Sequence, residues 1–317
     1  MNNIEYRGVD VAKLVFACLI PLLHISFKDS VEIELVRQYI ARLGVPFFFA
    51  VSGMMLTHSI QKRGKYEALR RYAKRLASLL VIWLVIYSPI LLVSMQDEPN
   101  VFQMLLFKTP AFLWYLTALL VASVPFCLIK SQYVLYFGSV LVYVWGTLMN
   151  GNYIWLTGGC AAYEQIFLTT RNGIFFALPF MCIGKLVINQ NVSQKRTILW
   201  IGGVVALILL FLEITFVGTK ISIGVDRSMY LMLPVVTYFL VRIILDINIP
   251  FDTQYFRGAS SAIYLMQFGI ITIMTYLLNK IRVEIQTESW LIYITLISVS
   301  CVLYWIIKNK RIVRHLF

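Results

Sequence analysis

The chain of 317 residues is 60% hydrophobic and only 14% charged, and its mean hydropathy is +0.78. A soluble globular domain carries about 25% charged residues, so this composition excludes a soluble protein of this size and indicates a polytopic membrane protein. The formal net charge of +13 fits the excess of Lys and Arg in cytoplasmic loops better than it fits nucleic-acid binding, and we expect no nucleic-acid partner.

Ten apolar runs follow one another along the chain, each suited to about one membrane crossing. None of them alternates with a period of two residues, so the predicted fold class is all-α, with about ten transmembrane helices in a single domain over residues 1–317. The runs lie near Val9–Ser26, Val45–Ile60, Leu76–Val93, Phe112–Ile129, Tyr133–Met149, Gly173–Ile188, Ile198–Val217, Met229–Leu245, Ala259–Leu278 and Trp290–Ile307. The amphipathic segment between Asn150 and Arg171 is expected to lie on the membrane or dip into it.

The distribution of Lys and Arg predicts that both termini are cytoplasmic. With the N-terminus inside, 18 of the 28 basic residues fall in inside segments or at the helix ends beside them, and 9 fall outside. The loop Lys62–Arg75 contributes most to this bias. We therefore expect a multi-pass protein of the cell membrane, in a bacterium the plasma membrane, in contact with membrane lipid.

The first run carries three ionisable residues, Asp10, Lys13 and His24. Such residues are costly inside a membrane helix and are therefore candidates for function. On a straight α-helix, Lys13 and His24 would be about 16 Å apart and on one face, because eleven residues make about three turns. They could then contact one long ligand. The alternatives are a His24 that hydrogen-bonds to a neighbouring helix and a Lys13 that extends to the inner interface.

Polar residues in two further places admit both structural and functional interpretations. Ser52 and Gly53 permit either close helix packing or a hydrogen bond to a neighbouring helix. The basic stretch Arg70–Arg75 either sets the topology or holds a phosphate or lipid head group.

Two carboxylates are predicted on the outer side, Glu164 and Glu213. Either of them could pair with Arg171 or orient His24, and the sequence does not choose between these options.

Taken together, these residues resemble the acyltransferase-3 family of integral membrane acyltransferases. The order and spacing of several motifs carry the resemblance over nearly the whole chain. The matching positions are Lys13 and His24 separated by ten residues, Phe47–Leu56, Arg71–Arg75, Leu113–Leu119, Arg171–Phe176 with Ile183–Gly184, and Ser261–Leu265.

The resemblance implies a ten-helix bundle that moves an acyl group, often acetyl, from cytoplasmic acyl-CoA to a hydroxyl of a cell-surface glycan or a related envelope acceptor. Acyl-CoA is then a donor substrate, and we expect no bound cofactor and no metal. The catalytic residue would be His24, whose neutral imidazole can take the proton of the hydroxyl. The donor-binding residues would be Lys13, Arg71, Lys74 and Arg75. The residues for the acceptor or the oxyanion would be Arg171, Asn172, Glu164 and Gln267.

The chain departs from the family pattern at two positions. Gln267 stands where the family often has a histidine, and Tyr72 stands near a frequent arginine position.

Two other classes of function stay open. The stretch Asp226–Tyr230 resembles the membrane half of the vancomycin-resistance serine racemases, which is associated with serine supply across the membrane. In a transporter of this kind, His24, Arg171 and Glu213 would line the substrate path. The third class is a membrane scaffold without catalysis.

Overall fold

The computed structural model of the chain is mainly helical in the residues that it describes. The described residues are 6–25, 27, 36–94, 109, 112–157, 167–190, 195–220, 228–281 and 285–310. Within these ranges every regular element is a helix and none is a strand, which confirms the all-α prediction. The chain divides into two compact units. The first comprises Met1–Val45, Ile82–Tyr87 and Ile244–Phe317, and the second comprises Pro46–Val81 and Ser88–Ile243.

Each of the ten predicted apolar runs contains a helix of similar extent. In chain order these helices are α1 (Arg7–Leu19) with the 3₁₀ turn η1 (Ile20–Leu23), α3 (Gly44–Arg63), α4 (Lys65–Ser94), α6 (Trp114–Leu128), α7 (Gln132–Met149), η5 (Gly173–Ala177) continued by α10 (Leu178–Asn189), α11 (Arg196–Gly218), α12 (Leu233–Leu245), α13 (Gln254–Ile281) and α14 (Ile285–Ile307). The short elements η2 (Val36–Ile40) and η3 (Ala41–Leu43) precede α3.

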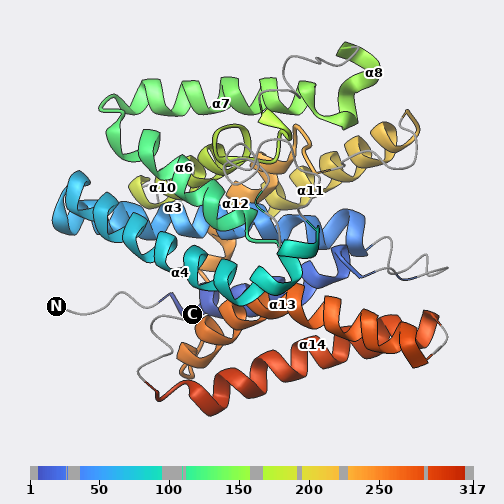
Figure 1. The fold of residues 1–317 in the computed structure, drawn as a ribbon. Coiled ribbons are helices and arrows are strands. Elements are labelled where there is room, and N and C mark those ends of the chain that lie inside the picture. Colours follow the sequence, from blue (N-terminus) through green and yellow to red (C-terminus); the bar gives the residue numbers. More distant parts are fainter. Residues whose placement is uncertain are drawn as a thin grey trace. The chain divides into compact units, whose positions relative to one another are not determined.

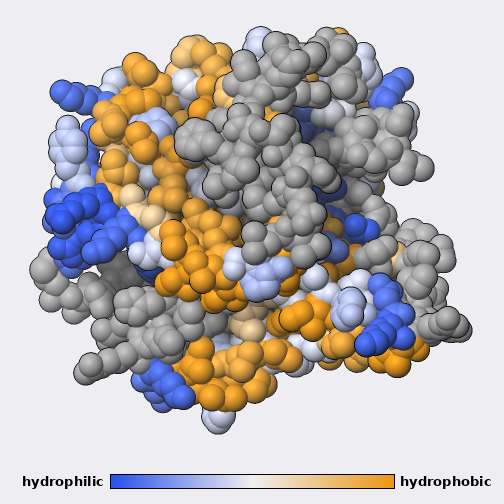
Figure 2. Space-filling view, viewed as in Figure 1, coloured by the Kyte–Doolittle hydropathy of each residue, from blue (hydrophilic) through white to orange (hydrophobic). Residues whose placement is uncertain are grey.

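Six helical segments of the described residues are long and apolar enough to cross a membrane, and several shorter apolar helices accompany them. Their outward faces are apolar: on α11, for example, Ile201 is 60% exposed and Phe216 is 56% exposed. Lipid tails are the medium that such faces require. Figure 2 shows hydrophobic side chains over much of the visible face, with hydrophilic ones gathered where α3 meets α4. The chain is a polytopic membrane protein, as predicted.

The basic stretch between α3 and α4 is helical, where the sequence analysis predicted a loop over Lys62–Arg75. Gly64 alone separates the two helices, and its φ of 81° is one that residues with a Cβ rarely adopt. Its N–H donates to the carbonyl of Ile60 at 2.8 Å, and its carbonyl accepts from Ala68 at 3.1 Å. The basic side chains are therefore displayed on regular helices rather than on a loop.

In the first unit, α1 runs parallel to α13, and α13 packs along α14. Figure 1 shows α13 and α14 side by side. An ion pair joins Asp10, near the start of α1, to Arg257 on the first turn of α13. At the other end, Ile25 packs with Leu278 near the end of α13 and with Ile292 of α14. Contacts at both ends thus fix the register of α1 against α13.

In the second unit, α3 crosses α10 with almost no side chain between the two backbones. A Cβ at Gly53 would overlap the carbonyl of Met181, and a Cβ at Gly184 would overlap the carbonyl of Ala50. The close packing predicted from Gly53 is confirmed, and small residues permit such contacts in membranes.

The segment between Asn150 and Arg171 begins with two short helical pieces, η4 (Gly151–Tyr153) and α8 (Ile154–Thr157). Residues 158–166, with the candidate Glu164, lie outside the described residues.

Candidate active site

The first membrane helix does not stay α-helical as far as His24. α1 ends at Leu19, and Ile20–Leu23 form a tighter 3₁₀ turn that contains Pro21. Proline has no N–H to donate to the preceding turn, which favours such a break. The half-buried His24 closes the 3₁₀ turn, and its N–H donates to the carbonyl of Pro21 at 2.9 Å.

This break corrects the geometry expected for Lys13 and His24. A 3₁₀-helix turns about 120° per residue, against about 100° in an α-helix, so four such residues shift the direction of His24 by about 80°. The prediction of one straight helix from Lys13 to His24 is therefore wrong, and ideal helix geometry no longer places the two side chains on one face.

Asp10 is the centre of a polar network at the start of α1. Its side chain is buried, with 3% of the residue exposed, and Arg257 of α13 holds both of its oxygens. The Arg257 Nε donates to Oδ1 at 3.1 Å and the Nη2 donates to Oδ2 at 2.8 Å. The hydroxyl of Thr253 donates to Oδ2 at 3.2 Å. Such a bidentate pair is among the strongest and most directional hydrogen-bonded arrangements in proteins.

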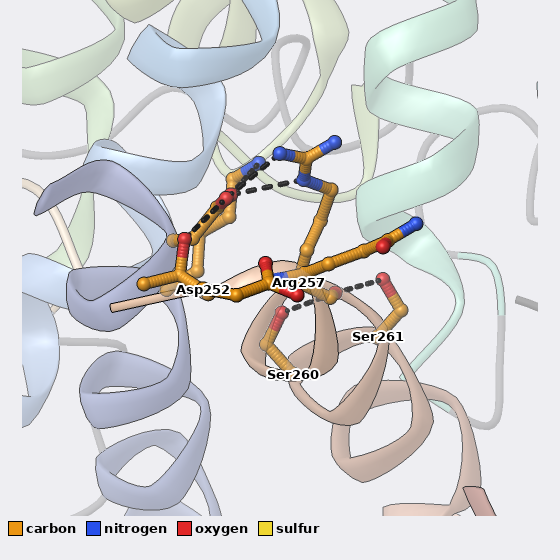
Figure 3. A network of polar contacts seen from close by, with 8 residues as sticks. Asp252, Arg257, Ser260 and Ser261 are labelled. Atoms are coloured by element: carbon orange, nitrogen blue, oxygen red, sulfur yellow. Dashed lines mark hydrogen bonds and ion pairs between the residues drawn. The ribbon is translucent and has the colours of Figure 1, made fainter. Parts of the chain in front are cut away.

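Lys13 belongs to the same network. Its Nζ is 4.0 Å from Oδ1 of Asp10, one turn earlier on α1, and its side chain is 18% exposed. Figure 3 shows Arg257 extending from α13 toward the network, with Ser260 and Ser261 further along the same helix. Two cations thus share one buried carboxylate.

Asp10 and Lys13 are candidates from the sequence, whereas Arg257 is there only one of the basic residues that indicate the topology. A carboxylate inside a membrane helix does require a partner, which is the signal that pointed to such a residue. This signal does not identify Arg257 itself, which is 247 residues away from Asp10 and is one of 28 basic residues.

Gln267 lies in the middle of α13 with 1% of its surface exposed. Its Oε1 has no hydrogen-bond partner in the described part of the chain. Two residues on either side of it in α13 contact Tyr87 of α4, whose hydroxyl donates to the carbonyl of Leu265 and accepts from the N–H of Gly269. The residue at the family's histidine position is therefore a buried amide with one unused acceptor.

The basic stretch of α4 has an exposed side and a buried side. Arg71, Lys74 and Arg75 are exposed, and Arg71 forms an ion pair with Glu67 one turn earlier. Tyr72 lies on the other side, on the face that carries the buried residues Ala68 and Leu76 and Leu79. Its hydroxyl is buried. Tyr72 therefore does not replace an exposed basic side chain.

Asn172 has a structural task at the start of η5. Its Oδ1 accepts from the N–H groups of Ile174 at 3.0 Å and Phe175 at 3.1 Å, and its Nδ2 donates to the carbonyl of Thr169 at 2.9 Å. This is the helix cap that an asparagine in front of a glycine favours. The neighbouring Arg171 places its guanidinium 5.1 Å from the centre of the Trp114 ring, within range of a cation–π contact.

Glu213 of α11 binds the start of α12. Its two oxygens accept from the N–H groups of Leu231 at 2.6 Å and Met232 at 2.8 Å, and it also accepts a hydrogen bond from the hydroxyl of Tyr153. Burial, together with this bond to Glu213, raises the pKa of Tyr153 above its usual value, so the phenol stays protonated and donates. The described contacts of Glu213 thus stabilise a helix N-terminus.

The candidate residues are divided between the two units. Lys13, His24 and Gln267 belong to the first unit, and Arg71, Lys74, Arg75, Arg171 and Asn172 belong to the second. Within the first unit, the structure brings Lys13 together with Asp10 and Arg257.

Comparison with known proteins gives one family and several distant relatives. The family model of acyltransferase-3, described as an acyltransferase domain, matches residues 6–308. A serine/alanine racemase of Enterococcus gallinarum is 27% identical over 266 residues, which cover 75% of this chain and 37% of the relative. An amino-acid racemase of Enterococcus faecalis is 23% identical over 336 residues, covering 96% of this chain and 46% of the relative.

The chain spans less than half the length of these curated relatives, and no solved structure matches it. The family match, in contrast, extends over nearly the whole chain and includes all the candidate residues. The chain therefore belongs to the acyltransferase-3 family.

Proposed function

We propose that this membrane acyltransferase moves an acyl group, most often acetyl, from cytoplasmic acyl-CoA to a hydroxyl of a cell-surface glycan or a related envelope acceptor. The observation that carries the proposal is the family match over residues 6–308, which includes Lys13 and His24 at the spacing of the family signature.

His24 is the catalytic base in this proposal. Its imidazole removes the proton of the acceptor hydroxyl while the oxygen attacks the thioester carbonyl. The tetrahedral intermediate collapses, the carbon–sulfur bond breaks, and the imidazolium returns its proton to the CoA thiolate. Imidazole suits both transfers because its pKa is close to neutral. His24 lies at the end of a 3₁₀ turn, and its backbone N–H is bonded to the carbonyl of Pro21. This supports the role because the backbone that carries the imidazole ring is held in place.

The donor is held by basic side chains. Lys13 contacts the phosphates of CoA from the inner end of α1, and the exposed Arg71, Lys74 and Arg75 of α4 bind further phosphate oxygens. An arginine fork matches phosphate oxygens in a bidentate manner. On the outer side, Arg171 beside the Trp114 ring is the candidate for the acceptor or the oxyanion, whereas Asn172 supports it by capping η5.

The experiment measures CoA release by the purified protein in lipid. Acetyl-CoA is supplied with and without a crude cell-envelope extract, and wild type is compared with His24→Ala. We expect acceptor-dependent release that falls at least about 100-fold in His24→Ala, because general bases contribute about 10²–10⁴-fold. A fully active His24→Ala protein would refute the mechanism. Thermal melting of both proteins establishes that they are equally folded.

The racemase relatives support a second candidate, transport of a small amino acid such as serine. Those relatives are a serine/alanine racemase and an amino-acid racemase, and this chain matches part of each. Folded protein that neither binds nor turns over acetyl-CoA, but takes labelled serine into vesicles, would favour transport over acyl transfer.

A further inference from the structure

We propose that Arg257 is a positioning residue: by occupying the carboxylate of Asp10, it keeps Lys13 directed to the phosphates of the acyl donor. This inference rests on the proposed function, in which Lys13 binds that donor. Asp10 has two cationic neighbours, Arg257 and Lys13, and it binds them unequally.

Arg257 is the main partner of the Asp10 carboxylate. Its two nitrogens bind the two carboxylate oxygens at 3.1 and 2.8 Å, and Thr253 adds a third hydrogen bond at 3.2 Å. Lys13, in contrast, lies 4.0 Å from the nearer oxygen, which is longer than a hydrogen bond. The carboxylate therefore attracts Lys13 without binding it tightly.

Several hydrogen bonds support the backbone around Arg257, whose side chain is 52% exposed. The Tyr255 hydroxyl donates to the carbonyl of Cys301 on α14 at 2.9 Å, which fixes the first turn of α13 from the side. Arg7 donates to the carbonyl of Ile249 at 3.3 Å, which ties the start of α1 to the segment before α13. Figure 3 shows the hydroxyls of Ser260 and Ser261 directed back to the Arg257 backbone, and Ser260 donates to its carbonyl at 2.9 Å. A supported fork of this kind is preorganised for its carboxylate.

Removal of the Arg257 side chain changes the contact between Lys13 and Asp10. A buried carboxylate that loses its main partner is strongly destabilised, so it draws in the nearest remaining cation. In Arg257→Gln that cation is Lys13, which then forms a direct ion pair with Asp10 and presents less charge to a phosphate. In Asp10→Asn this attraction to position 10 disappears, so Lys13 is no longer drawn away from a phosphate. The two substitutions therefore act on donor affinity in opposite directions.

The experiment titrates coenzyme A alone into purified protein in nanodiscs and follows the heat of binding. The proteins are wild type, Arg257→Gln, Asp10→Asn and the double variant. We expect the Kd for CoA to rise about tenfold in Arg257→Gln. It should stay equal or fall in Asp10→Asn, and it should return to within about twofold of wild type in the double variant. In acyl transfer, the effect should appear in KM for the donor, with kcat at saturating donor unchanged.

Asp252→Asn is the matched control. Asp252 is exposed and lies five residues before Arg257 (Figure 3), and its Oδ1 accepts from the N–H of Gln254 at 2.9 Å, which asparagine can also do. This variant removes the same charge as Asp10→Asn, and it should bind CoA like wild type. Arg257→Lys keeps a cation but loses the fork, and it should raise the Kd about threefold. It also tests the inference if Arg257→Gln fails to fold.

Two results overturn the inference while leaving the proposed function intact. One is an equal Kd in all folded variants, and the other is a loss of CoA binding in Asp10→Asn as large as in Arg257→Gln. Either result would make the ion pair a purely structural link between α1 and α13. Wild-type protein that is folded yet binds no CoA would instead refute the proposed function itself. Melting temperatures measured on the same samples separate lost affinity from lost folding.

Discussion

Asp10 and Glu213 are both carboxylates on helices of a membrane protein, yet they are compensated in different ways. Asp10 is buried, and its neighbours are two cations, Arg257 and Lys13, with one hydroxyl. Glu213 is half-buried, and its described donors are all neutral: the phenol of Tyr153 and two backbone amides at the start of α12.

The difference indicates which carboxylate has a structural task. Neutral donors and a helix N-terminus satisfy Glu213 inside its own unit and leave no net positive charge beside it. Asp10 is instead held by two cationic side chains, in a chain that is proposed to bind a polyanionic donor. An ionisable residue in a membrane helix is a functional candidate by default, but the charge of its partners decides how far that assumption holds.

Replacement of Glu213 should give the largest loss of stability in this comparison. In Glu213→Ala the Tyr153 hydroxyl and two amides lose their acceptor, and we expect a loss of about 2 kcal/mol, because each unsatisfied donor is costly but the site is half open to solvent. Thermal melting in detergent measures this loss. CoA release per folded molecule should be unchanged. A variant that melts like wild type but has lost acyl transfer would contradict the structural assignment and would favour Glu213 as part of a substrate path.

Replacement of Tyr153 should have a smaller effect of the same kind. Tyr153→Phe removes one of the three donors to Glu213 while keeping the ring in place, so we expect a loss of about 1 kcal/mol. If the two residues act through one interaction, the double variant Tyr153→Phe/Glu213→Ala should be no less stable than Glu213→Ala alone. Fully additive losses would show that Tyr153 is bound by something other than Glu213.

Much of the fold follows from local patterns in the sequence. The ten apolar runs coincide with helices because burial in lipid depends on runs of residue types, which are visible without tertiary information. Pro21 is the local signal for the break in the first helix, which a straight helix from Lys13 to His24 leaves out. The cap formed by Asn172 was also a local signal, since asparagine directly precedes Gly173 at a helix start.

The partners of the charged residues cannot be predicted from the sequence, for a physical reason. Arg257 is one of many basic residues, and only tertiary packing selects it for Asp10. The donors to Glu213 include backbone amides, which every residue except proline carries, so no side-chain pattern marks them. The sequence therefore predicts which ionisable groups need a partner more readily than it predicts the partner.

Glu67 completes the comparison as a carboxylate at the surface of α4, with a side chain that is 38% exposed and an exposed cationic partner, and its removal should have the smallest effect. It pairs with Arg71 one turn later on α4, in contact with solvent, where salt screens the attraction and the two side chains lose rotational freedom. Glu67→Gln should leave the melting temperature unchanged. Because it removes a negative charge beside a proposed donor-binding arginine, it should tighten CoA binding by less than about twofold at low salt and not at all at high salt. A large change that persists at high salt would mean that Glu67 and Arg71 act on the donor as Asp10 and Arg257 are proposed to act, and the distinction between buried and exposed carboxylates would then fail.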